Sequence, residues 1–227
     1  EICSRDWSSD VCSSDLSWLT INKDSDFSIY NIPFGIFSDN PNKSNARHGV
    51  AIGDYIVDLN VLQKHGFFDS IKELRPDLFA NSTLNEFLSL GNDVCYKVRK
   101  HLQNLFLVSN ENLKSKTEVA ERALIPSNKA HMLMPIEVKE YVDFYSSISH
   151  ATNVGKMFRD EKNALLPNWK YIPIGYHGRS SSIVTTGTSF HRPKGQTRVD
   201  ETQPPIFESS KRLDFELEMA FIVGKST

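Results

Sequence analysis

The segment from residue 213 to residue 223 constrains the fold more than any other part of the chain. Its first half alternates apolar and acidic residues, which places Asp214, Glu216 and Glu218 on one face of an extended strand. Its second half, Ala220-Phe-Ile-Val223, is apolar on both faces, as is typical of a strand inside a sheet. Such a strand needs sheet neighbours, so the sequence predicts a sheet-containing domain around it.

The acidic face of this segment admits two interpretations. The simpler one is an amphipathic strand whose acidic face is solvated. Neighbouring carboxylates on a partly buried face, in contrast, repel each other and need a cation or raised pKa values. Because the apolar second half indicates an interior strand, we favour a metal site over a solvated face.

A second segment carries a carboxylate, a phenol and an imidazole within eight residues, at Asp143, Tyr145 and His150. A lone histidine is more often structural than catalytic, and the neighbouring groups make His150 a candidate general base. Arg159 follows nine residues later. Its guanidinium can grip a substrate carboxylate through two hydrogen bonds, or form a surface ion pair with an acidic residue beside it.

The composition excludes several classes of function. A net charge of -2 over 227 residues gives no basic surface for nucleic acid. The apolar runs are too short to cross a bilayer, and no secretory signal is visible. Three cysteines, Cys3, Cys12 and Cys95, make neither a disulfide framework nor a zinc pattern. We therefore expect a cytoplasmic protein that binds neither membrane nor nucleic acid.

Turn residues and periodicity divide the chain into three expected regions. Residues 1–16 contain Ser-Ser-Asp twice, lack any period, and are expected to be a non-native or disordered tail. Residues 17–130 are expected to form a small barrel with helices, ending in a polar linker over 114–130. Frequent Pro, Gly and β-branched residues predict a β-rich domain over 131–227.

Local signals predict individual elements of the first domain. Residues 34–37 and 50–52 read as strands, and Gly53-Asp54 reads as the tight turn of a hairpin. Thr83-Leu-Asn-Glu86 has the pattern of a capping box that begins a short helix, and Gly91 is expected to end or bend that helix. A stripe at helical spacing then predicts a packed helix, through Val94, Val98, Leu102 and Leu105.

Several long motifs, in order along the chain, resemble the fumarylacetoacetase family. They are Asp143-Phe-Tyr-Ser-Ser with His150-Ala-Thr-Asn-Val-Gly155, Asn163-Ala-Leu-Leu-Pro-Asn-Trp169, Gly175-Tyr-His-Gly-Arg179 and Leu213-Asp-Phe-Glu-Leu-Glu218. The resemblance covers residues 18–227 and is strongest from Tyr141 onward. The family's fourth metal carboxylate and the glutamate that orients its base lie beyond Thr227, so we expect a truncated chain with little or no activity.

The resemblance implies a β-rich α+β fold, with a small SH3-like β-barrel ahead of the first part of a mixed β-roll catalytic domain. It also implies a metal-dependent hydrolase that cleaves a carbon–carbon bond of 4-fumarylacetoacetate to give fumarate and acetoacetate, the last step of tyrosine and phenylalanine degradation. The family is typically a homodimer. The roles it implies are metal ligands at Asp143, Glu216 and Glu218, a general base at His150, and substrate contacts at Tyr145, Arg159 and Tyr176.

The residue chemistry agrees with this reaction. Hydrolysis of a carbon–carbon bond needs an activated water, a task for a base such as His150, and stabilisation of a developing enolate. A set of carboxylate ligands selects Ca²⁺ or Mg²⁺ over zinc. Two alternatives remain open: another hydrolase or decarboxylase of the wider superfamily, and a non-catalytic binding or assembly module that keeps the fold.

Overall fold

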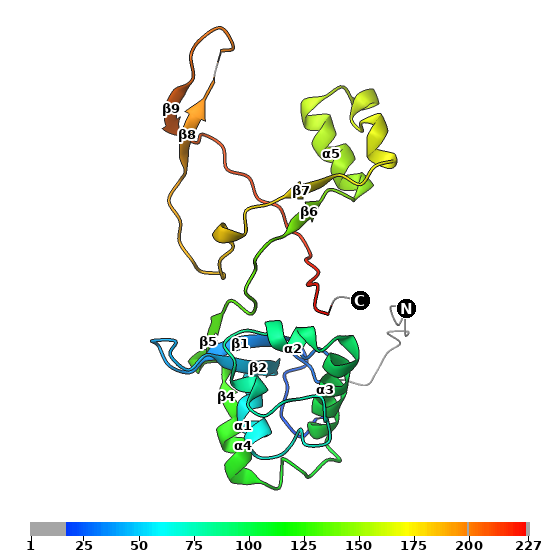
Figure 1. Cartoon of the computed structure of the whole chain (residues 1–227), viewed down its shortest axis with the longest axis vertical. Helices are drawn as coiled ribbons and strands as arrows, with labels where there is room; N and C mark the ends of the chain where they lie inside the picture. Colours follow the sequence, from blue (N-terminus) through cyan, green and yellow to red (C-terminus); the bar gives the residue numbers. More distant parts are fainter. Residues whose placement is uncertain (1–16, 199, 226–227) are drawn as a thin grey trace. The chain divides into compact units, whose positions relative to one another are not determined.

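The computed structural model describes residues 17–198 and 200–225, which form two compact units (Figure 1). One unit holds the described residues up to Ile136 together with those from Thr185 onward. The other unit runs from Glu137 to Val184. The expected N-terminal tail, residues 1–16, lies outside the described residues.

A five-stranded antiparallel sheet with the order β4-β3-β2-β1-β5 organises the first unit. Its strands are β1 (Phe34–Ser38), β2 (Arg47–Ile52), β3 (Tyr55–Asp58), β4 (Leu124–Pro126) and β5 (His131–Leu133). Ile52 pairs with Tyr55 across the β2–β3 turn, where Gly53 has a φ of 54° that glycine adopts without strain. The predicted strands and the hairpin at Gly53-Asp54 are confirmed.

The connection between the two edge strands shows that this sheet curls. β4 and β5 lie at opposite edges, four strand spacings apart, which is about 19 Å in a flat sheet. Only Ser127–Ala130 joins them, and three of these residues form the 3₁₀ turn η3 (Ser127–Lys129). Even fully extended, that connection reaches only about 17 Å, and the turn shortens it. The sheet is therefore a curled half-barrel.

Helices pack on this sheet and complete the core. They are α1 (Leu59–Lys64), η2 (Leu78–Ala80), α2 (Asn85–Ser89), α3 (Asn92–Leu105) and α4 (Thr117–Ala123). The predicted apolar stripe is buried along α3, and Gly91 separates α2 from α3 with a φ of 93°, as expected. Large buried side chains join the elements, among them Phe79, Phe87 and Phe106.

Two sequence-based predictions for this unit are wrong. The expected linker over 114–130 instead contains α4 and β4, because β4 finds hydrogen-bonding partners on β3 and becomes part of the sheet. The expected capping box also does not form, since no side-chain cap is made at the start of α2. The Glu86 carboxylate instead accepts hydrogen bonds from Arg75 and Asn81.

A buried ionic group ties β2 to α1. Arg47 Nε lies 2.5 Å from Asp58 Oδ2, and Asp58 Oδ1 accepts a hydrogen bond from Val61 N at 3.0 Å, which caps α1. Asp58 is 1% exposed, so its charge depends on these partners. Arg47 also pairs with Asp39 at 3.0 Å and lowers the pKa of that carboxyl to about 2.

The second unit contains two short antiparallel strands with a helix between them in the sequence. β6 (Val142–Phe144) pairs antiparallel with β7 (Gly175–His177), and α5 (Ile148–Phe158) begins after β6. Three 3₁₀ turns follow, η4 (Glu161–Asn163), η5 (Pro167–Lys170) and η6 (Ser180–Ser182). Gly155 permits close packing of α5, because a Cβ there would lie 1.9 Å from the Ala164 carbonyl oxygen.

The expected strand over residues 213–223 is not present. The last strands described are β8 (Lys194–Thr197) and β9 (Ile206–Ser209), which pair with each other, and residues 211–225 have neither helix nor strand. Leu217 is 97% exposed. An extended segment becomes a strand only when a neighbour completes its backbone hydrogen bonds, and none of the described strands does so here.

Among the described residues, no helix is long and apolar enough to span a bilayer.

Candidate functional site

The strand pair of the second unit brings two predicted site residues together. Asp143 lies directly opposite Tyr176 in the antiparallel register of β6 and β7. Directly opposed residues project to the same face of the sheet, so the carboxylate and the phenol share one face. Asp143 is half-buried, whereas Tyr176 is 63% exposed. The predicted metal ligand and the predicted substrate contact are therefore neighbours.

Tyr145 and His150 form a second pair just beyond β6. The two rings are 5.8 Å apart between centroids and inclined at 80°, an edge-to-face arrangement. The Tyr145 hydroxyl donates to the Ala151 carbonyl at 3.2 Å. Tyr145 N donates to the Ile174 carbonyl at 3.2 Å, which extends the β6–β7 pairing by one residue. Tyr145 thus links the strand pair to the first turn of α5.

His150 occupies the first turn of α5, and a local cap fixes its backbone. Ser147 is the N-cap residue of α5, and its hydroxyl accepts a hydrogen bond from His150 N at 3.3 Å. His150 is exposed to solvent. An exposed imidazole anchored at its backbone and packed on one side by Tyr145 is suitable for taking a proton from water.

Arg159 ends α5 and is anchored through its own backbone and side chain. Arg159 N donates to the Gly155 carbonyl at 2.9 Å, and Nη1 donates to the Ala164 carbonyl at 3.2 Å. The side chain is exposed, and a guanidinium has five N–H donors, so others can serve a ligand. Of the acidic residues beside it, Glu161 pairs with Lys156 at 2.6 Å.

The three predicted metal ligands divide between the two units. Asp143 belongs to the second unit, whereas Glu216 and Glu218 lie in the exposed segment of the first unit that follows β9. Within residues 17–198 and 200–225, no three His, Cys, Asp or Glu side chains are grouped so that they could hold one metal ion. The three-carboxylate site therefore stays a prediction.

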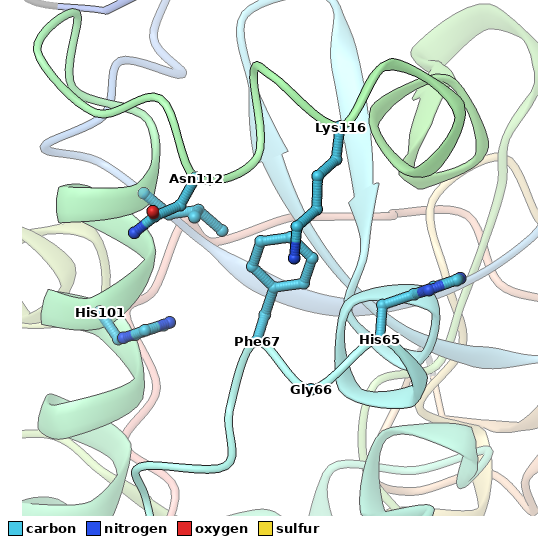
Figure 2. A pocket seen from close by; sticks show the side chains of 7 residues that line it. His65, Gly66, Phe67, His101, Asn112 and Lys116 are labelled. Atoms are coloured by element: carbon cyan, nitrogen blue, oxygen red, sulfur yellow. The ribbon is translucent and has the colours of Figure 1, made fainter.

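A hollow in the first unit has a different chemical character (Figure 2). It measures about 200 Å³ and lies where the turn after α1, helix α3 and the segment before α4 meet. Figure 2 shows the Lys116 side chain over the Phe67 ring, and the ammonium is 4.8 Å from the ring centroid. Its lining residues are His65, Gly66, Phe67, His101, Leu105, Asn112 and Lys116. Because no carboxylate lines it, this hollow does not suit Ca²⁺.

Sequence reasoning assigned no role to one residue beside the Tyr145–His150 pair. Trp169, in η5, donates its indole N–H to the Tyr145 carbonyl at 2.9 Å. The residue lies 24 positions from its acceptor, so no local period indicates the contact. The only available signal was the place of Trp169 inside a motif that carries the family resemblance.

Comparisons with known proteins agree with the motifs. Residues 30–135 match the family model described as fumarylacetoacetase N-terminal. The chain is 48% identical over 209 residues to the fumarylacetoacetase of Rattus norvegicus, 47% identical to that of Homo sapiens and 46% identical to that of Caenorhabditis elegans. Each match covers 92% of this chain and 49% of the relative.

The chain thus spans about half the length of the curated relatives it matches, although the similarity covers nearly all of its own length. By the family model and by these relatives together, the chain belongs to the fumarylacetoacetase family and matches the N-terminal half of its relatives.

Proposed function

We propose that this chain provides the first half of a metal-dependent hydrolase that cleaves a carbon–carbon bond of 4-fumarylacetoacetate. The observation that carries the proposal is the 48% identity to fumarylacetoacetase over 92% of the chain. The geometry of the second unit supports it, because Asp143 faces the same side as Tyr176 and Tyr145 packs on His150. These are the residue types that the reaction requires.

The proposed roles follow from the chemistry of each side chain. His150 takes a proton from the attacking water as general base. Arg159 binds a substrate carboxylate through its exposed guanidinium. Tyr176, beside Asp143, contacts the substrate through its hydroxyl, and Tyr145 contacts it through its ring or as a hydrogen-bond acceptor, since its proton is donated to Ala151.

The donor set fits a hard cation. Asp143, Glu216 and Glu218 offer only carboxylate oxygens, which suit Ca²⁺ or Mg²⁺ rather than zinc. When bound, such an ion would stabilise the enolate charge that develops as the carbon–carbon bond breaks. Glu216 and Glu218 are two residues apart, so in a strand both would project to the same face. We propose that these three side chains hold the ion in the complete protein.

We further propose that the finer architecture is that of the family. The curl of the β4-to-β5 sheet supports a small SH3-like barrel in the first unit. The segment after β9 would become an interior strand of a β-roll once further chain pairs with it, because its apolar side chains are now exposed. On this view the 227-residue chain alone has little or no activity, and the full-length cytoplasmic protein is a homodimer.

The test compares this chain with a version extended to the length of its relatives. The extended protein should hydrolyse 4-fumarylacetoacetate in the presence of Ca²⁺ or Mg²⁺, and His150→Ala and Asp143→Asn should each abolish turnover. Lys162→Gln, an exposed residue of the same unit, is the matched control and should leave turnover unchanged. Cleavage of a simpler acylpyruvate in place of 4-fumarylacetoacetate would indicate another superfamily hydrolase. Metal binding without any turnover would indicate a binding or assembly module.

A further inference from the structure

A continuous set of contacts leads from Trp169 to His150 within the second unit. The Trp169 indole N–H donates to the Tyr145 carbonyl at 2.9 Å. The Tyr145 hydroxyl donates to the Ala151 carbonyl at 3.2 Å. The Tyr145 ring lies 5.8 Å from the His150 ring, centroid to centroid. Each contact joins a different pair of groups, and Tyr145 takes part in all three, so Tyr145 connects Trp169 to His150.

Both backbone polar groups of Tyr145 have fixed partners. Its N–H donates to the carbonyl of Ile174, the residue just before β7, and its carbonyl accepts from Trp169 in η5. Tyr145 lies after the end of β6, where the strand ladder no longer supplies a partner for that carbonyl. The indole has one donor and no acceptor. Trp169 therefore fixes the backbone that carries the Tyr145 ring.

The far end of the Tyr145 side chain is fixed as well. The phenol has one proton, and that proton is donated to Ala151, the residue after His150. The ring is held by its backbone at one end and by α5 at the other. It then packs edge-to-face on the imidazole, an arrangement in which one ring limits the rotation of the other.

We propose that Trp169 is a positioning residue, whose indole N–H orients Tyr145 so that the Tyr145 ring holds the His150 imidazole in one rotamer. The inference rests on the proposed role of His150 as general base. The contribution of Trp169 to catalysis is indirect, because this residue acts through Tyr145. A displaced base loses the alignment with water that proton transfer requires.

The first test uses the 227-residue chain and needs no activity. The variant Trp169→Phe keeps an aromatic ring and removes the N–H donor, and Tyr145→Phe keeps the ring and removes the hydroxyl. The matched control is Trp18→Phe, because the Trp18 indole donates to the Leu105 carbonyl at 3.0 Å in the first unit. The readout is the NMR chemical shift of the His150 ring protons, which the Tyr145 ring current displaces.

In both second-unit variants the His150 ring protons should move toward the shifts of an unstructured histidine, while α5 residues away from Ala151 keep their amide shifts. Trp18→Phe should leave the His150 signals unchanged. His150 signals that do not move in Trp169→Phe would overturn the proposal. Amide shifts showing that α5 has unfolded would also overturn it, because Trp169 would then stabilise the unit rather than orient one ring.

A second test in the extended, active protein separates this inference from the proposed function. Trp169→Phe should lower kcat about 10- to 100-fold with little change in KM, since it misplaces a catalytic group without touching the substrate. Unchanged kcat in Trp169→Phe, with turnover lost in His150→Ala, would refute the positioning role alone. Full turnover in His150→Ala would refute the proposed function, and the NMR result on the ring contacts would stand.

Discussion

His48 should make the first unit sensitive to mild acid. The residue is 0% exposed on β2, and it packs against Phe79 and Phe87 with ring centroids 5.5 and 6.3 Å away. Its Nε2 lies 2.8 Å from the Thr83 carbonyl, which can only accept, so Nε2 carries the proton of the neutral ring. Nδ1 is buried and has no hydrogen-bond partner among the described residues. A second proton would place an uncompensated charge there.

The size of the effect follows from the pKa of His48. Burial lowers this pKa from 6.5 to about 4, although the Thr83 carbonyl and the Glu86 carboxylate partly oppose the shift. Below about pH 6.5 the His48 imidazole binds a proton in the unfolded chain, whereas in the folded chain it stays neutral until about pH 4. The stability that the neutral His48 contributes above pH 6.5 is therefore lost as the pH falls toward 4. Each pH unit in this range costs about 1.4 kcal/mol, so lowering the pH from 7 to 5 should cost about 2 kcal/mol.

Urea unfolding of the wild-type chain and of His48→Gln at pH 7 and pH 5 measures this effect. Glutamine can still donate to the Thr83 carbonyl but does not titrate. Burial also lowers the pKa of His101, which contributes equally to both proteins. Hydrogen bonds from Arg47 and Arg75 lower the pKa values of Asp39 and Glu86 to about 2, so the stability that these carboxylates contribute is lost at lower pH. The wild type should lose about 2 kcal/mol more than the variant between the two pH values. Equal losses would refute the argument.

Three further substitutions, two of them with a control variant, test the interactions inside each unit. Asp58→Asn should destabilise the first unit by about 3 kcal/mol in a urea titration, because it leaves the Arg47 charge without its buried partner. The control Lys114→Gln removes the exposed ion pair with Glu111 and should cost less than about 1 kcal/mol. Leu102→Ala should cost about 3 kcal/mol by leaving a cavity, and an unchanged urea midpoint would contradict this. Gly155→Ala should loosen α5 and speed its proteolysis, whereas Gly195→Ala, which has open space for a Cβ, should not.

Local patterns in the sequence predicted the elements that local interactions determine. The β2–β3 hairpin follows from Gly53 at its turn, and the buried stripe of α3 follows from helical spacing. The failed predictions concern elements that depend on distant partners. Arg75 binds the carboxylate that the capping box would have used, and β4 forms because β3 lies beside it. The segment after β9 has the composition of a strand, but it pairs with none of the strands in the described part of the chain.

The same distinction holds for the candidate site. Tyr145 and His150 are only five residues apart in the sequence, so their ring contact forms within one short segment. The opposition of Asp143 and Tyr176 depends on the register of β6 and β7, which the sequence does not specify by itself. Trp169 was missed because its hydrogen bond spans 24 residues and its acceptor is a backbone carbonyl. Backbone acceptors have no signature in the amino-acid sequence.

The central claim is that Asp143, Glu216 and Glu218 hold one hard cation beside His150 in the complete protein. The most direct measurement is a crystal structure of the chain extended to the length of its relatives and grown with Ca²⁺. Our account predicts that one carboxylate oxygen from each of the three residues lies about 2.3–2.6 Å from the ion, with the His150 ring lining the same cavity. A structure in which Glu216 and Glu218 face solvent, away from Asp143, would contradict it.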